Sequence, residues 1–130
     1  YNGADIYDDY AHHPGELKGL LDAVEPLGYK RTILVFQPHT YTRTAALFDD
    51  FIEQLVRPDV TYLAEIYAAR EHNTLGISSA DLARQIDGCH FCPKFEQIEA
   101  ALRETARPGD IILTVGAGDV YKIGEHLVCK

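Results

Sequence analysis

Two uninterrupted apolar segments constrain the fold of this chain more than any other feature. They are Thr32–Phe36 (TILVF) and Ile111–Val115 (IILTV). A continuous apolar run of this kind is expected for a β-strand that is covered on both faces, and such strands are typical of parallel sheets. The two segments therefore predict a buried parallel sheet with helices on both sides.

The rest of the chain alternates strand and helix patterns around these segments. Shorter strand patterns occur at Ala4–Asp8, Val60–Ile66 and His90–Cys92. Helix patterns run from Pro14 to the glycine at Gly28, over Arg43–Leu55, from Ser78 or Ser79 to Ile86, over Phe95–Ala106 and over Asp119–Val128. The alternation predicts one α/β domain over residues 1–130, with three layers and a mostly parallel sheet of five to six strands.

Composition narrows the possible classes of function. The 130 residues have a formal net charge of −8, which argues against nucleic acid as a partner because phosphates are bound by surplus Lys and Arg. No apolar run approaches the roughly 20 residues of a membrane span, and no signal peptide opens the chain. Three cysteines, an odd count, favour a reducing cytoplasm. Since Tyr1-Asn2-Gly3 starts the chain abruptly, we expect a piece of a longer protein.

The first polar cluster follows the first predicted strand. Ligands of helix-covered parallel sheets bind at the carboxyl ends of the strands, and Asp8–Pro14 (DDYAHHP) stands at that place. Two carboxylates, a tyrosine and two imidazoles meet a helix start, whose free N–H groups suit phosphate or carboxylate. The cluster predicts an anion site, and the alternative is that Asp9 or His12 only caps the helix.

A second polar segment, Gln37–Thr44 (QPHTYTRT), follows the strand Thr32–Phe36. Arg43 stands at a predicted helix start, where its charge opposes the helix dipole unless an anion is bound nearby. Because a guanidinium group suits a carboxylate or a phosphate, we interpret Arg43 as an anion-binding residue. The alternative is a solvated arginine beside an ordinary turn.

The loops after the third and fifth strands carry weaker signals. Glu65–Asn73 (EIYAAREHN) follows the third strand, and its ordinary explanation is a surface ion pair between Arg70 and Glu71 or a neighbour. Gly116–Asp119 (GAGD) allows close backbone approach, with a tight turn as the alternative. It is not a dinucleotide fingerprint, because Tyr121 occupies the place of the third glycine.

Two familiar motifs are weak or missing. The lone Cys89-x-x-Cys92 lies inside a predicted strand, whereas redox pairs lie at a helix start, and a zinc site would need two more ligands. We interpret these cysteines as having neither role. The chain has no GxxxxGKS or GxxxxGKT phosphate loop, so another domain would have to hold most of the phosphates of a bound nucleotide.

The four loop motifs, DDYAHHP, FQPHTYTR, EIYAARE and GAGD, resemble in order and spacing those of the C-terminal domain of the Mur ligase family, in its branch that joins L-alanine to UDP-N-acetylmuramate. The resemblance runs from about Ile6 to the chain end. It implies a Rossmann-like lid of a cytoplasmic peptidoglycan-synthesis enzyme, with the UDP-binding and ATPase domains outside this chain. ATP and Mg2+ would be held mainly by the ATPase domain. ATP would phosphorylate the muramate carboxylate, and the L-alanine amine would attack the acyl phosphate. The isolated domain would be inactive.

The resemblance also implies site residues. The nucleotide and the reacting centre would be faced by Asp9, Tyr10 and His12. The amino acid would be bound by His39, Tyr41, Arg43, Gly116, Ala117 and Gly118, and Tyr67 to Glu71 would line its pocket. His12 and Arg43 would be catalytic, and no residue would bind a metal. Where some relatives have arginine this chain has Thr40, so the clamp on the amino-acid carboxylate would rest on Arg43 with less help.

Two other functions stay open from the sequence. A related ligase that recycles murein peptides is similar, but it typically has Phe at the position of Tyr10 and lacks FQPHTYTR. A free-standing receiver-like regulatory module would also have paired acids after its first strand, like Asp8 and Asp9. It needs an Asp after the third strand and a Lys after the fifth, where this chain has Glu65-Ile66 and Gly116-Ala117.

Overall fold

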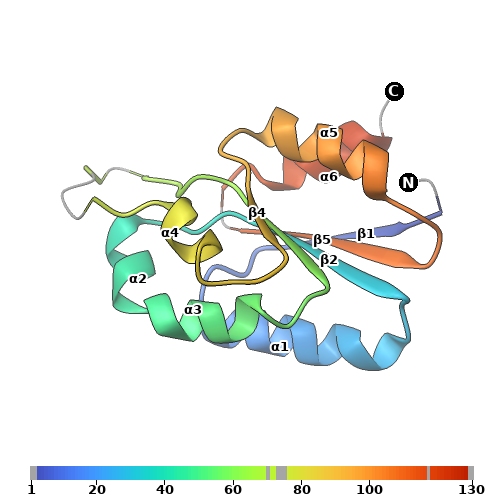
Figure 1. Cartoon of the computed structure of the whole chain (residues 1–130), viewed down its shortest axis with the longest axis horizontal. Coiled ribbons are helices and arrows are strands. Elements are labelled where there is room, and N and C mark those ends of the chain that lie inside the picture. Colours follow the sequence, from blue (N-terminus) through green and yellow to red (C-terminus); the bar gives the residue numbers. More distant parts are fainter. Residues whose placement is uncertain (1–2, 70, 73–75, 117, 129–130) are drawn as a thin grey trace.

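The computed structural model describes residues 3–69, 71–72, 76–116 and 118–128, and these form a three-layer α/β domain (Figure 1). Within these ranges, five strands make one parallel sheet in the order β1-β5-β2-β3-β4. The strands are β1 (Asp5–Asp9), β2 (Arg31–Phe36), β3 (Val60–Leu63), β4 (Cys89–Phe91) and β5 (Asp110–Val115). The two apolar segments thus lie at the centre as β2 and β5, which confirms the predicted fold class.

Helices cover both faces of the sheet. They are α1 (Pro14–Val24), α2 (Tyr41–Ala46), α3 (Phe48–Leu55), α4 (Ser79–Ala83), α5 (Phe95–Thr105) and α6 (Tyr121–Val128), with a 3-10 turn η1 (Glu25–Leu27) after α1. Leu34 and Phe36 of β2 pack with apolar residues of α1, α3 and α4, whereas Ile33 and Val35 pack with α5 and α6. Because side chains alternate along a strand, one apolar strand supplies two separate cores. Figure 1 shows α1 and α3 on one side of the sheet and α5 and α6 on the other.

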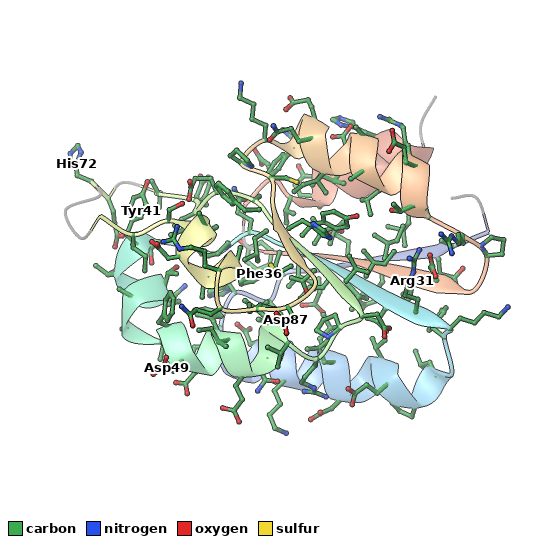
Figure 2. The ribbon with its side chains drawn as sticks, in the orientation of Figure 1. Arg31, Phe36, Tyr41, Asp49, His72 and Asp87 are labelled. Carbon is green, nitrogen blue, oxygen red and sulfur yellow. The ribbon has the colours of Figure 1, made fainter. Side chains whose placement is uncertain are left out.

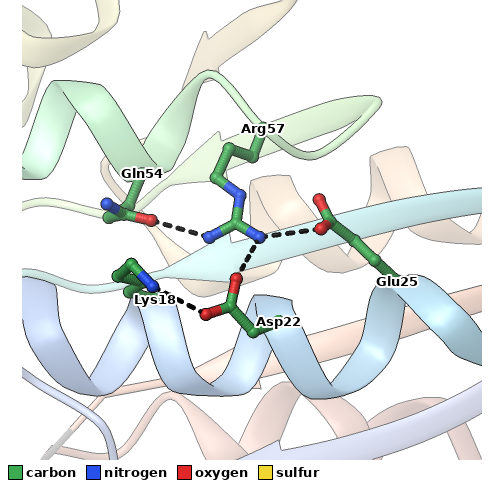
Figure 3. Close-up of polar contacts among 5 residues, drawn as sticks. All are labelled: Lys18, Asp22, Glu25, Gln54 and Arg57. Atoms are coloured by element: carbon green, nitrogen blue, oxygen red, sulfur yellow. Dashed lines mark hydrogen bonds and ion pairs between the residues drawn. The ribbon is translucent and has the colours of Figure 1, made fainter.

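A polar network at the surface joins α1 to the end of α3 (Figure 3). The Arg57 guanidinium donates to Asp22 at 2.7 Å, to Glu25 at 2.8 Å and to the side-chain oxygen of Gln54 at 2.9 Å. Asp22 also accepts a hydrogen bond from Lys18 at 2.9 Å. Since the carboxylates are half exposed, the network contributes little to stability and mainly sets how α1 lies against α3.

The predicted helix Arg43–Leu55 is wrong, because the structure has two helices that meet at Leu47 (φ −112°, ψ 24°). The apolar residues of the pattern belong to α3, which buries Phe51 and Leu55. The only buried residue of α2 is Thr44, whose hydroxyl donates to the Thr40 carbonyl at 2.7 Å. The core therefore holds α3, whereas α2 buries no apolar residue.

The predicted strand Val60–Ile66 is too long, since β3 ends at Leu63. Leu63, Ala64 and Ile66 are all buried, so the apolar pattern continues past the last ladder pair. Beyond that pair the Gln37 side chain donates to the Glu65 carbonyl at 3.1 Å. Pairing then resumes as a single parallel bridge between His39 and Tyr67.

The remaining differences are at element ends. α1 stops at Val24 because Pro26 has no N–H to continue the helical ladder, and Gly28 (φ 80°) ends the following turn. α4 ends at Ala83 rather than Ile86, and α6 begins at Tyr121 rather than Asp119. In the described part of the chain, no helix has both the length and the apolar character needed to cross a bilayer.

Candidate functional site

The loops after β1, β2 and β3 meet at the carboxyl edge of the sheet. Figure 2 shows Tyr41 near this edge and Arg31 at the opposite end of the strands. Four rings follow one another here. The ring centroids of Tyr10 and His12 are 6.1 Å apart, those of His12 and His39 are 5.7 Å apart, and those of His39 and Tyr67 are 5.5 Å apart. Residues from three separate loops therefore form one row.

Arg43 joins this row through His39. One guanidinium nitrogen, Nη1, lies 3.3 Å from Nδ1 of His39. A guanidinium group only donates hydrogen bonds, so Nδ1 of His39 accepts and carries no proton. Among the ion pairs of residues 3–69, 71–72, 76–116 and 118–128, none includes Arg43. A half-buried cation without a carboxylate partner in that part of the chain is suited to an external anion.

The imidazole of His39 is held in its neutral form. Burial lowers the pKa of His39 below its ordinary value of 6.5, and the neighbouring Arg43 and His12 lower it further, while Glu71 acts in the opposite direction. An anion that bound between Arg43 and His39 would oppose these effects and favour imidazolium. Anion binding at this place would therefore be coupled to proton uptake at His39.

A backbone bridge fixes the position of His39. The Tyr67 N–H donates to the Pro38 carbonyl at 2.8 Å, and the Thr40 N–H donates to the Tyr67 carbonyl at 2.8 Å. Thr40 itself has φ 65° and ψ 146°, a conformation that costs a β-branched residue free energy. The loop after β2 is therefore held in its shape by the loop after β3.

The start of α1 shows that the predicted capping alternative is wrong for both Asp9 and His12. The N-cap is His13, whose Nδ1 accepts a hydrogen bond from the Gly15 N–H at 3.1 Å. Asp9 instead accepts from the Ala11 N–H at 2.8 Å and shapes the turn after β1. His12 is left to face His39, with its Nδ1 3.2 Å from the Tyr10 carbonyl oxygen and 3.6 Å from a Glu16 carboxylate oxygen.

The start of α2 has a capping residue that the sequence did not reveal. The Glu71 carboxylate accepts from the Tyr41 N–H at 2.7 Å, from the Thr42 N–H at 3.1 Å and from the Thr42 hydroxyl at 2.6 Å. The sequence suggested Arg70 as the partner of Glu71, but Arg70 lies outside the described residues. No local pattern gives this contact, since about thirty residues separate the partners.

The glycine loop after β5 borders an open cavity of about 480 Å³ beside the row of rings. A Cβ at Gly116 (φ 154°) would come within 3.0 Å of Val120 and 3.1 Å of the Gln37 carbonyl oxygen, and one at Gly118 would come within 3.2 Å of the Tyr67 ring. Both glycines thus stand where the chain packs closely on itself, as the tight-turn alternative expects, and the approach of a ligand to this loop stays a prediction. Ala117 lies outside the described residues. The cavity is lined by Asp8, Asp9, Tyr10, Tyr67, Gly116, Gly118, Asp119 and Tyr121.

The cysteine motif has no geometry for shared chemistry. Cys89 packs against the core under α1 and α3, and Cys92 packs against the core under α5, so the two side chains lie on opposite faces of the sheet. Burial raises the pKa of Cys89 to about 11 and also raises that of Cys92. In the part of the chain that the structure covers, no group of three or more His, Cys, Asp or Glu is placed to hold a metal ion.

Comparison with known proteins places this geometry in a family context. Residues 1–118 match the family described as "Mur ligase, glutamate ligase domain". The chain is 49% identical over 133 residues to UDP-N-acetylmuramate–L-alanine ligase of Agathobacter rectalis, with 99% of this chain and 29% of that protein covered. It is 47% identical over 132 residues to the protein of the same name from Lachnospira eligens, with 98% of this chain and 29% of that protein covered. The chain thus spans under a third of the length of these relatives.

Solved structures agree with the fold. A UDP-N-acetylmuramate–alanine ligase of Thermotoga maritima has a TM-score of 0.72 at 24% identity, covering 95% of this chain and 26% of that one. A murein peptide ligase of Psychrobacter arcticus has a TM-score of 0.74 at 19% identity, covering 98% and 28%. At these identities the likeness concerns the fold alone.

Proposed function

Since this chain belongs to the Mur ligase family as its glutamate ligase domain, we propose that it is the amino-acid-binding lid of an ATP-dependent ligase that joins L-alanine to UDP-N-acetylmuramate. The relatives at 47–49% identity that carry this name support the substrate pair. The proposed complete enzyme has a UDP-binding domain and a central ATPase domain in addition to this chain. Its proposed place of work is the cytoplasm, where ATP is available.

The observation that carries the proposal is the pairing of Arg43 with His39 at the carboxyl edge. Arg43 is half-buried, forms no ion pair within the described residues and lies 3.3 Å from a neutral imidazole. A planar fork of donors next to an acceptor that can take up a proton suits the carboxylate of an amino acid. We assign the carboxylate of L-alanine to these two residues, and we propose that Tyr41, Gly116 and Gly118 contact the rest of the amino acid, with the glycines on the wall of the cavity that Asp9 and Tyr10 also line.

The first loop supplies the proposed nucleotide side of the lid. Asp9 and Tyr10 line the 480 Å³ cavity, and the Tyr10 side chain is 71% exposed, so its ring is available to a ligand held by another domain. His12 lies between this side and His39, with its ring 5.7 Å from that of His39. We therefore propose that His12 faces the reacting centre, between the nucleotide and the amino acid.

In the proposed reaction, the γ-phosphoryl group of ATP passes to the muramate carboxylate, giving ADP and an acyl phosphate. The L-alanine amine attacks the acyl carbon, loses a proton, and the tetrahedral intermediate expels phosphate to leave the amide. Among the described residues no cluster of acidic or other ligating side chains is placed to hold Mg2+, and the chain has no phosphate loop. We therefore propose that the central domain holds Mg2+ and the phosphates of ATP.

The contribution of this chain to that reaction is positioning. Holding the amine against the acyl carbon in a reactive geometry lowers a barrier by roughly 7–11 kcal/mol in favourable cases. A closed lid also excludes water, which would otherwise hydrolyse the acyl phosphate. Cations such as Arg43 near the developing oxyanion add electrostatic stabilisation.

A substrate competition with the full-length ligase tests the proposal. L-alanine, L-serine, glycine and the tripeptide L-alanyl-γ-D-glutamyl-meso-diaminopimelate compete for UDP-N-acetylmuramate and ATP, and the products are separated by mass. We expect L-alanine to have the highest kcat/KM and the 130-residue chain alone to give no product. Preference for the tripeptide would assign a recycling ligase instead, and turnover by the isolated chain would contradict the assignment of ATP to another domain.

A further inference from the structure

We propose that Glu71 is a positioning residue for the amino-acid site: its carboxylate fixes the start of α2 and thereby holds Arg43 against His39. The role in catalysis rests on the function proposed above, whereas the role in placing Arg43 does not. Glu71 itself would contact none of the substrates, because both of its carboxylate oxygens accept hydrogen bonds from donors of α2.

The geometry of these three contacts is that of a strong cap. One carboxylate oxygen accepts from two consecutive N–H groups, those of Tyr41 (2.7 Å) and Thr42 (3.1 Å), and the other accepts from the Thr42 hydroxyl (2.6 Å). A helix start presents unpaired N–H groups and a positive dipole end, both of which a carboxylate satisfies. Consistently, the bond from Thr42 lowers the pKa of Glu71 below its ordinary value.

α2 needs this support, because little else stabilises it. It has six residues and buries only Thr44, whereas isolated helices of that length are unstable in water. The cap supplied by its own N-cap residue is weak, since the Thr40 hydroxyl accepts from the Arg43 backbone N–H at a long 3.4 Å. Thr40 also has the costly φ of 65°, which persists only where its surroundings enforce it.

The loop after β3 brings Glu71 to this place. The bridge between His39 and Tyr67 aligns the two loops. The chain then turns through Ala69 (φ 56°), with the Glu71 N–H donating to the Ala68 carbonyl at 2.9 Å. The loop after β3 thus contacts the loop after β2 at two places, at His39 and at the start of α2. Arg43 follows directly after Thr42, the last residue of the second contact.

The pKa of His39 in the 130-residue chain separates positioning from a simple charge effect. Burial and the charges of Arg43 and His12 lower this pKa, while the Glu71 charge raises it. In Glu71→Gln the amide keeps an acceptor for the two N–H groups, and the hydroxyl of Thr42 can accept instead of donate. Only the charge is lost, so we expect the His39 pKa to fall. In Glu71→Ala the start of α2 is released, Arg43 moves away and His39 gains solvent, so we expect the pKa to rise.

NMR titration of the His39 imidazole measures both shifts. Opposite shifts in Glu71→Gln and Glu71→Ala support positioning. Shifts of the same sign, or none in either variant, overturn it, because Glu71 would then act by its charge alone or not at all. Thr42→Val, which removes one of the three donors, should shift the pKa in the same direction as Glu71→Ala but by less.

Kinetics of the full-length ligase test the consequence for function. We expect Glu71→Ala to raise the L-alanine KM about tenfold with the ATP KM unchanged, and Glu71→Gln to recover most of that loss. The matched control is Asp59→Ala, which also removes a carboxylate bound to a backbone N–H, that of Thr32 at 2.7 Å, but at the start of β2 and β3. It should lower stability and leave the L-alanine KM unchanged. Equal effects of the two alanine variants on KM would make Glu71 merely structural. A wild-type enzyme that does not use L-alanine would refute the proposed function, and the NMR result would still decide the role of Glu71.

Discussion

Replacement of Arg43 by alanine in the full-length ligase tests the assignment of the amino-acid carboxylate most directly. Among the described residues, the Arg43 guanidinium has one hydrogen-bond partner, His39 at 3.3 Å, and no carboxylate partner, so most of its donors are available to a ligand. A hydrogen bond to a charged group contributes about 1.5–3 kcal/mol. Since about 1.4 kcal/mol corresponds to a factor of ten, we expect Arg43→Ala to lower kcat/KM for L-alanine roughly 10- to 100-fold.

The assay follows ADP release while L-alanine is varied at saturating ATP and UDP-N-acetylmuramate. Arg43→Lys should recover only part of the loss, because an ammonium group lacks the planar fork of guanidinium. The control is Arg84→Ala, in which the lost side chain is 68% exposed and pairs with Asp81 on α4; its kinetics should match the wild type. A folded Arg43→Ala enzyme with unchanged kcat and KM for L-alanine would refute the assignment and leave the carboxylate without a partner in this chain.

Three further predictions concern stability. Asp110 is 3% exposed and accepts hydrogen bonds from Arg31 at 2.6 and 3.2 Å. Asp110→Ala should therefore lower the free energy of unfolding, measured in urea, by about 3 kcal/mol. A loss below about 0.5 kcal/mol would be inconsistent with a buried pair. The pKa of His39 in the folded chain lies below its ordinary value of 6.5. Between these two pKa values the unfolded chain binds more protons than the folded one. Stability should therefore be complete above about pH 6.5 and fall on acidification, and His39→Asn should reduce this fall in denaturation at pH 7.5 and 5.5; an unchanged pH profile would count against the lowered pKa. Gly116→Ala should destabilise by about 1–3 kcal/mol, whereas Gly19→Ala, in the open middle of α1, should stabilise by about 0.5–1 kcal/mol; equal effects would contradict the close contact at Gly116.

Most of the fold was predictable because its signals are local. The continuous apolar segments at β2 and β5 required cover on both faces, and the alternation of strands and helices required a parallel sheet. The ends of elements were less predictable. The residues after Leu63 stay buried although the ladder has ended, and the apolar pattern of α3 hides the break at Leu47, because burial and hydrogen bonding do not stop at the same residue.

The proximity of the polar loops was predictable for a similar reason. Parallel strands all end at one edge, so the polar motifs after β1 and β2 had to lie near each other, and the structure places His12 beside His39 and Arg43 beside His39. The capping of α1 was not predictable in detail. His13 takes that role, although Asp9 belongs to a residue type that caps more often, because the turn after β1 directs the Asp9 carboxylate to the Ala11 N–H.

The sequence by itself determined the order of strands and helices, which faces of the central strands are buried, and which loops carry the polar motifs. These properties follow from periodicity and side-chain chemistry over a few residues. Only the tertiary structure decided that β1 lies beside β5, where the Thr114 hydroxyl donates to Asp8 at 2.8 Å, and that Glu71 caps α2. Contacts of this kind join residues far apart in the chain, and they depend on the path that the packed sheet and helices impose on the loops, which no short stretch of sequence specifies.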